Sequence, residues 1–92
     1  TEENIQAIAR LMLGQLKKRL DANEYDVEFT DEAVAEIAKE GFDPVYGARP
    51  LRRAIQSKIE DMLSEKIIDG EISHNEKIKV TAKDKEFVLE TA

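Results

Sequence analysis

The spacing of the apolar residues changes from helical to alternating twice along this chain, and these changes predict the order of its elements. Residues 4–23 carry apolar side chains at steps of three and four, which is typical of a helix buried on one face. Residues 25–29 alternate apolar and acidic side chains and predict a short strand. Thr30 and Asp31 offer an N-cap for a second helix, which we expect to end at Glu40 because Gly41 can take a left-handed conformation.

The second half of the chain repeats this change of period. Pro50 suits the first turn of a third helix, where its missing N–H costs nothing, and Gly70 is expected to end that helix. Residues 77–82 and 86–91 alternate again and predict an antiparallel hairpin around a turn at 83–85. The apolar stripe expected for the third helix consists of Leu51, Ala54, Ile55, Ile59, Met62, Leu63, Ile67 and Ile68.

Together these elements predict an α+β fold, in which three helices pack against one face of a small sheet. A hairpin alone is barely stable, so we expect the strand at residues 25–29 to join it. The 92 residues suffice for a single small domain, residues 1–92. Because the chain starts at Thr1 rather than at a methionine, we expect it to be a fragment of a longer protein.

The charge balance narrows the classes of partner. The net charge is −6, which argues against binding nucleic acid or an anionic membrane over the whole surface. No apolar run approaches the ~20 residues that a membrane span needs. The chain has no cysteine, which excludes disulfides and thiolate catalysis and fits a cytoplasmic location.

The most unusual segment is the loop Gly41–Gly47 together with the arginines that follow it. We expect Arg49, Arg52 and Arg53 to lie on the first turn of the third helix. The amino end of a helix carries about half a positive charge, so cations are unfavourable there and anions are favoured. An anion between the arginines and the helix end, most simply a phosphate, would resolve the conflict.

Ion pairing is the alternative explanation of these arginines. Arg52 and Arg53 could pair with Glu60, with Asp61 or with acidic residues of another segment. Composition alone does not decide between an anion site and ion pairs.

The loop also has residues with a simple structural interpretation. Phe42 and Tyr46 are expected to pack the loop onto the core. Gly47 is expected to supply a backbone angle that other residues resist.

Self-sufficient catalysis is not expected. A P-loop needs the pattern G-x-x-x-x-G-K-[ST], and none of the four glycines belongs to one. His74, the only histidine, is expected in a surface turn without the further ligands that a metal site requires. The many carboxylates are expected on solvated faces, so we assign no catalytic residue and no metal ligand to the chain.

One long motif adds a family resemblance to this interpretation. It comprises Gly41-Phe42-Asp43-Pro44, then Tyr46-Gly47-Ala48-Arg49-Pro50-Leu51-Arg52-Arg53, then Ile55-Gln56, and finally Ile59-Glu60-Asp61 and Leu63-Ser64-Glu65. The motif resembles the carboxyl-terminal small subdomain of Clp-family AAA+ unfoldases, which belongs to their second ATPase module. The similarity extends from the first helix to the final hairpin, and it is greatest to ClpC or ClpE, with ClpB next.

The resemblance implies a fold of the AAA+ small-subdomain, or lid, type and a role for one arginine. Gly47, Ala48 and Arg49 correspond to the sensor-2 motif, which implies that Arg49 reaches the γ-phosphate of ATP. It also implies that ATP, with magnesium, is held mainly by a large subdomain of the same chain, which carries the P-loop. This chain has no P-loop and no pore loop, so we expect neither ATPase activity nor tightly bound nucleotide from it alone.

The resemblance further implies the partners of a parent protein. Members of the family are homohexameric rings that couple ATP hydrolysis to threading unfolded substrate proteins through a pore. ClpC-like members pass the chains to a partner peptidase, and ClpB-like members disaggregate. Arg52 and Arg53 would then contact either phosphate or a neighbouring subunit.

Two alternatives stay open. The segment could be purely an oligomerisation module, whose arginines bind acidic residues across the ring without touching nucleotide. It could also be an autonomous anion-binding or adaptor domain, which would require the isolated chain to bind ATP at sub-millimolar affinity.

Overall fold

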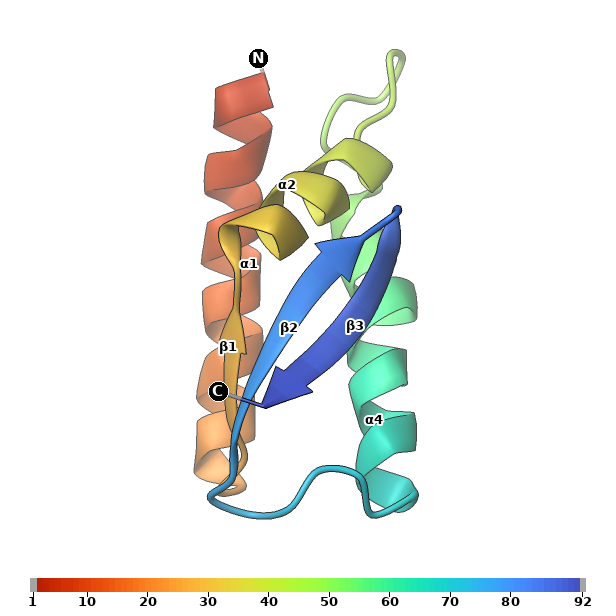
Figure 1. Ribbon diagram of the computed structural model, residues 1–92. Helices are drawn as coiled ribbons and strands as arrows, with labels where there is room; N and C mark the ends of the chain where they lie inside the picture. Colours follow the sequence, from red (N-terminus) through yellow and green to blue (C-terminus); the bar gives the residue numbers. More distant parts are fainter. Residues whose placement is uncertain (1, 92) are drawn as a thin grey trace.

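Three helices cover one face of a three-stranded sheet in the computed structural model, which describes residues 2–91 (Figure 1). This is the α+β layer that the sequence predicts. The third helix is continuous but changes its hydrogen-bonding pattern twice along its length. The elements are α1 (Glu2–Ala22), β1 (Asp26–Phe29), α2 (Asp31–Glu40), α3 (Leu51–Ala54), the π-helical segment η1 (Ile55–Glu60), α4 (Asp61–Ile68), β2 (Lys77–Lys83) and β3 (Glu86–Thr91).

The sheet has the order β1-β2-β3. β1 lies parallel to β2, with Val27 opposite Ile78, so the predicted joining of the first strand to the hairpin is confirmed. β2 and β3 are antiparallel, and β2 extends one residue further than predicted, to Lys83. The hairpin turn is therefore only Asp84 and Lys85, which both have positive φ (51° and 69°), as a two-residue turn between twisted strands requires.

Thr30 links the sheet to α2, as its predicted role as N-cap requires. Its Oγ1 accepts a hydrogen bond from the Ala33 N–H (3.2 Å), which satisfies one of the free donors at the helix start. The same hydroxyl donates to Oγ1 of Thr81 on β2 (2.9 Å). Since Thr81 is buried, this bond pairs a polar group that would otherwise be costly in the interior.

A single core lies between the helices and the sheet. The stripe predicted for the third helix is largely confirmed, but Ile68 is 83% exposed and does not belong to it. The buried residues are Ala9, Leu13, Leu16, Val27, Ala33, Val34, Ile37, Ala38, Leu51, Ile55, Ile59, Leu63, Ile72, Ile78 and Val80.

The π-helical segment follows from the spacing of that stripe. Leu51, Ile55, Ile59 and Leu63 are all buried and stand four residues apart. An α-helix turns by about 100° per residue, so each four-residue step overshoots by about 40°, and three steps would move Leu63 about 120° off the core face. The wider i→i+5 turn of η1 takes up this excess and keeps all four side chains on one face.

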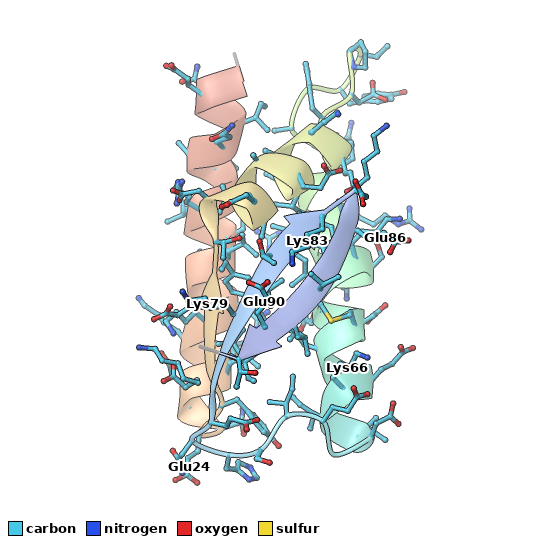
Figure 2. All side chains as sticks on the ribbon, in the orientation of Figure 1. Glu24, Lys66, Lys79, Lys83, Glu86 and Glu90 are labelled. Atoms are coloured by element: carbon cyan, nitrogen blue, oxygen red, sulfur yellow. The ribbon has the colours of Figure 1, made fainter. Side chains whose placement is uncertain are left out.

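The outer face of the sheet is charged, and no helix covers it. Figure 2 shows Lys79, Lys83 and Glu90 on this face. Lys83 Nζ lies 3.0 Å from Glu90 Oε2, and Lys77 Nζ lies 3.3 Å from Glu28 Oε1. Among the described residues, no helix is long and apolar enough to cross a membrane.

Candidate functional site

The segment between α2 and α3 is a structured turn that is built on Asp43. The backbone groups of Asp43 and Gly47 exchange two hydrogen bonds, of 2.8 and 2.7 Å. Asp43 Oδ1 accepts two more, from the N–H groups of Val45 (2.7 Å) and Tyr46 (3.1 Å). Gly47 has φ +63°, so the prediction that it supplies an unusual backbone angle is confirmed.

Arg49 follows this turn directly and precedes the third helix. Its N–H donates to the Tyr46 carbonyl (3.2 Å), and Leu51 N–H donates to the Ala48 carbonyl (3.0 Å). These turn bonds delay the helix, whose N-cap is Pro50 rather than an earlier residue. The expectation that Arg49 lies on the first helical turn is therefore wrong, and Pro50 caps that turn instead of lying within it.

The Arg49 side chain is exposed and lies near the ring of Tyr46. Its Cζ lies 5.8 Å from the ring centroid of Tyr46, within the range of a cation–π contact. It forms no ion pair with any residue in the described part of the chain. Gly47 and Ala48 set the backbone position from which this guanidinium projects.

Arg52 and Arg53 lie on α3 as expected, and both are exposed. Among the side chains of residues 3–91 neither forms an ion pair, so the ion-pair alternative with Glu60 or Asp61 is wrong. Glu60 pairs with Arg19 of α1 instead, at 3.5 Å. The structure thus brings three arginines to the start of the third helix, and none of the described side chains is an acidic partner for them.

The apolar side chains of the turn face solvent. Phe42 is 46% exposed, Val45 80% and Tyr46 61%. The expectation that Phe42 and Tyr46 pack the loop onto the core is therefore wrong. The hydrogen bonds around Asp43, rather than aromatic packing, hold the turn in place, and they hold it away from the core.

Gly41 anchors the turn at its other end by close contact. Its φ is −92°, so the left-handed conformation expected for it does not occur. A Cβ at this position would lie 2.7 Å from Leu51 Cα and 2.6 Å from Leu51 Cδ1. Glycine is needed here because the end of α2 presses against the start of α3.

Glu40, which precedes Gly41, has an unusual environment that the sequence did not indicate. Its Oε2 is buried without a hydrogen-bond partner in the described structure, and its Oε1 lies 4.0 Å from Lys58 Nζ. Burial, together with the nearby Glu36 carboxylate, raises the pKa of Glu40 to about 7, while Lys58 and Lys39 act in the opposite direction. The one feature of the sequence that could have indicated this environment is the spacing of four residues between Glu36 and Glu40 on α2.

His74 lies at the surface, as the sequence predicts. His74 is exposed, and its ring stacks on that of Tyr25 with centroids 4.5 Å apart. No group of three or more acidic, histidine or cysteine side chains could hold a metal ion within the described residues.

The comparisons with known proteins agree with this arrangement. A family model described as the C-terminal, D2-small domain of ClpB protein matches residues 1–80. The chain is 46% identical to chaperone protein ClpB of Oceanobacillus iheyensis over 96% of its own length and 11% of that protein. It is 46% identical to the negative regulator of genetic competence ClpC/MecB of Bacillus subtilis over 98% of its length, and 45% identical to the ATP-dependent Clp protease ATP-binding subunit ClpC of Staphylococcus aureus over all of it. In both cases it again spans 11% of the relative.

The family model covers most of the chain, and the relatives are similar along nearly its whole length. The chain therefore belongs to the family of C-terminal D2-small domains of the Clp ATPases, the chaperones and unfoldases that include ClpB and ClpC.

Proposed function

We propose that this domain is the nucleotide-sensing lid of an ATP-dependent Clp unfoldase and that Arg49 is its sensor. In this proposal Arg49 contacts the γ-phosphate of ATP, which is bound with magnesium by the large subdomain of the same parent chain. The observation that carries the proposal is the exposed Arg49 guanidinium, which has no acidic partner among the described residues although the chain carries 20 acidic side chains.

The chemistry of arginine supports this role. A guanidinium stays charged at any physiological pH and can form two parallel hydrogen bonds to phosphate oxygens. Phosphoryl transfer spreads negative charge over the transferred group, and a positioned cation stabilises that charge. The turn around Asp43 supplies the rigid attachment that such positioning needs.

The apolar side chains beside Arg49 support a covered position in the parent protein. Phe42, Val45 and Tyr46 expose apolar surface on the turn that carries Arg49. Contiguous apolar surface beside a polar rim is typical of an interaction site. We infer that the large subdomain covers this turn when nucleotide is bound, and that rotation of the lid moves Arg49 towards or away from the phosphate.

The rest of the proposal concerns the parent protein. We infer a cytoplasmic homohexamer that unfolds substrate proteins for degradation by a partner peptidase or for disaggregation. The domain itself would contribute the sensor and a contact to the neighbouring subunit, whereas ATP hydrolysis would require the P-loop of the large subdomain.

Replacement of Arg49 in the full-length parent tests the sensor role. Arg49→Ala should lower the rate of ATP turnover at saturating ATP at least tenfold, because one positioned donor to the developing charge is lost. The turnover rate of Arg49→Lys should lie between those of the parent and Arg49→Ala, since lysine keeps the charge but loses the bidentate contact. Turnover would be measured together with nucleotide affinity and hexamer formation.

The control is Lys79→Ala, which removes an equal charge from the outer face of the sheet. It should leave turnover unchanged. Unchanged turnover in Arg49→Ala would refute the sensor role.

A pure assembly role is the second candidate. It is favoured by the exposed apolar turn and by Arg52 and Arg53, which have no acidic partner among the described side chains. In that case Arg49→Ala should reduce the fraction of hexamers, while the hexamers that still form should keep their turnover and nucleotide affinity.

A further inference from the structure

A groove of about 270 Å³ lies between α1 and the first half of the third helix. Both helices contribute to its walls. We refer to it as the α1–η1 groove, and it is lined by Met12, Arg19, Arg52, Ile55, Gln56 and Glu60.

The floor of the groove is apolar and its rim is charged. Met12 is partly buried against the core, and Ile55 belongs to the core with only 6% of its surface exposed. Arg19 Nη2 and Glu60 Oε1 form an ion pair between the two helices at 3.5 Å, so their charges largely cancel. Arg52 has no such partner in the described structure, so two arginines face one glutamate and the groove is locally positive on a chain of net charge −6.

The π-helical segment determines which side chains reach the groove. Ile55 and Glu60 are the first and last residues of η1, and Gln56 lies between them. The wider turn keeps Ile55 on the core side while Gln56 is exposed at the groove, where its amide forms no hydrogen bond to any described residue. Such single π-helical turns occur often at functional sites.

We propose that the α1–η1 groove binds an acidic segment of a protein partner. An apolar side chain of that segment packs on Met12 and Ile55, and a neighbouring carboxylate pairs with Arg52 and accepts a hydrogen bond from Gln56. Opposite charges across the contact supply specificity and rapid association.

The chemistry of the groove favours a protein segment over other anions. A free phosphate would gain nothing from the apolar floor of Met12 and Ile55. A nucleic acid carries a continuous row of phosphates, so the acidic body of the domain would repel it more strongly than a short segment with a carboxylate at the groove. Because Arg49 does not line the groove, the proposal does not depend on the sensor role of Arg49, although it shares Arg52 with the assembly role considered above.

The test is an NMR titration of the 92-residue chain with a short peptide that carries one leucine flanked by glutamates. The amide resonances of Met12, Ile55 and Gln56 should shift and saturate. A matched peptide with glutamines in place of the glutamates should bind about tenfold more weakly. Replacement of the leucine by serine should also weaken binding, because the apolar contact is lost.

The matched variants are Arg52→Gln in the groove and Lys79→Gln on the outer face of the sheet. Arg52→Gln should weaken binding of the acidic peptide about threefold to fivefold, the effect of one exposed ion pair. Lys79→Gln should leave the affinity unchanged. Arg52 is exposed and unpaired in the described structure, so its replacement should not disturb the fold, and thermal unfolding would verify this.

Two results would overturn the proposal. Equal weakening by Arg52→Gln and Lys79→Gln would show unspecific attraction to positive charge. Inorganic phosphate that shifts the same groove resonances at lower concentration than the peptide would show a site for small anions instead.

Discussion

Among the single residues, Gly41 and Gly14 should respond in opposite ways to the same change. A Cβ at Gly41 would collide with the backbone of Leu51, so Gly41→Ala should lower the free energy of unfolding by about 1–3 kcal/mol. Gly14 lies within α1, and a Cβ there would meet no other atom within 4 Å, so Gly14→Ala should raise it by about 0.5–1 kcal/mol. Urea unfolding of both variants measures the difference, and a neutral Gly41→Ala would contradict the close contact.

Glu40 should make the stability of the domain depend on pH. Its pKa is raised from 4.5 to about 7, so the folded state holds the proton more tightly than the unfolded state. The contribution is therefore favourable at acidic pH and is lost as the pH rises from about 4.5 to about 7.

Glu40→Gln should remove this dependence. The side chain is 24% exposed, so solvent screens part of the penalty, and we expect the variant to be more stable by about 1 kcal/mol at pH 8 and equal to the parent near pH 4. Thermal unfolding across this range measures the effect. Parallel pH profiles of the two proteins would rule out the raised pKa.

Among the helices and strands, the π-helical segment η1 should depend on a single extra residue in the third helix. Deletion of Ser57 removes the extra residue of η1 and leaves Leu51, Ile55, Ile59 and Leu63 at successive steps of four, three and four residues, which a regular α-helix keeps on one face. All four side chains should stay buried in a regular α-helix, so the free energy of unfolding, measured by urea unfolding, should change by less than about 1.5 kcal/mol.

The control is Ser57→Ala, which keeps the length of the helix. This exposed substitution should change stability by less than about 0.5 kcal/mol. A Ser57 deletion that is destabilised by several kcal/mol would show that η1 does more than take up one excess residue.

The whole molecule, taken alone, should bind ATP only weakly. Three exposed arginines at ~1 kcal/mol each supply ~3 kcal/mol, which falls short of the ~4 kcal/mol that a Kd of 1 mM requires. The net charge of −6 opposes ATP further. We expect isothermal titration to give a Kd for magnesium-bound ATP weaker than about 1 mM, whereas sub-millimolar binding would favour an autonomous anion-binding domain.

Local signals account for most of what the sequence predicts correctly. The helices and strands follow from apolar periodicity, and the cap at Thr30 and the stop at Gly70 follow from side-chain and backbone chemistry. Leu51, Ile55, Ile59 and Leu63 are four residues apart, a spacing that a π-helical turn accommodates, although apolar periodicity alone predicts a regular helix.

Non-local contacts account for the errors. The conformation of Gly41 depends on Leu51, ten residues away, and the exposure of the aromatic turn depends on where Asp43 holds it. The pairing of Glu60 with Arg19 rather than with Arg52 required two helices to be placed side by side. Spacing along one chain segment carries no information about such distances.

By itself the sequence therefore determined the elements, their order, the family and the three arginines, because each depends on neighbouring residues or on a contiguous motif. Only the tertiary structure decided which arginines are left without a partner in the described chain, that Arg49 precedes the helix, and that Arg52 faces a groove. The physical reason is that charge pairing, burial and close packing act between segments that folding brings together.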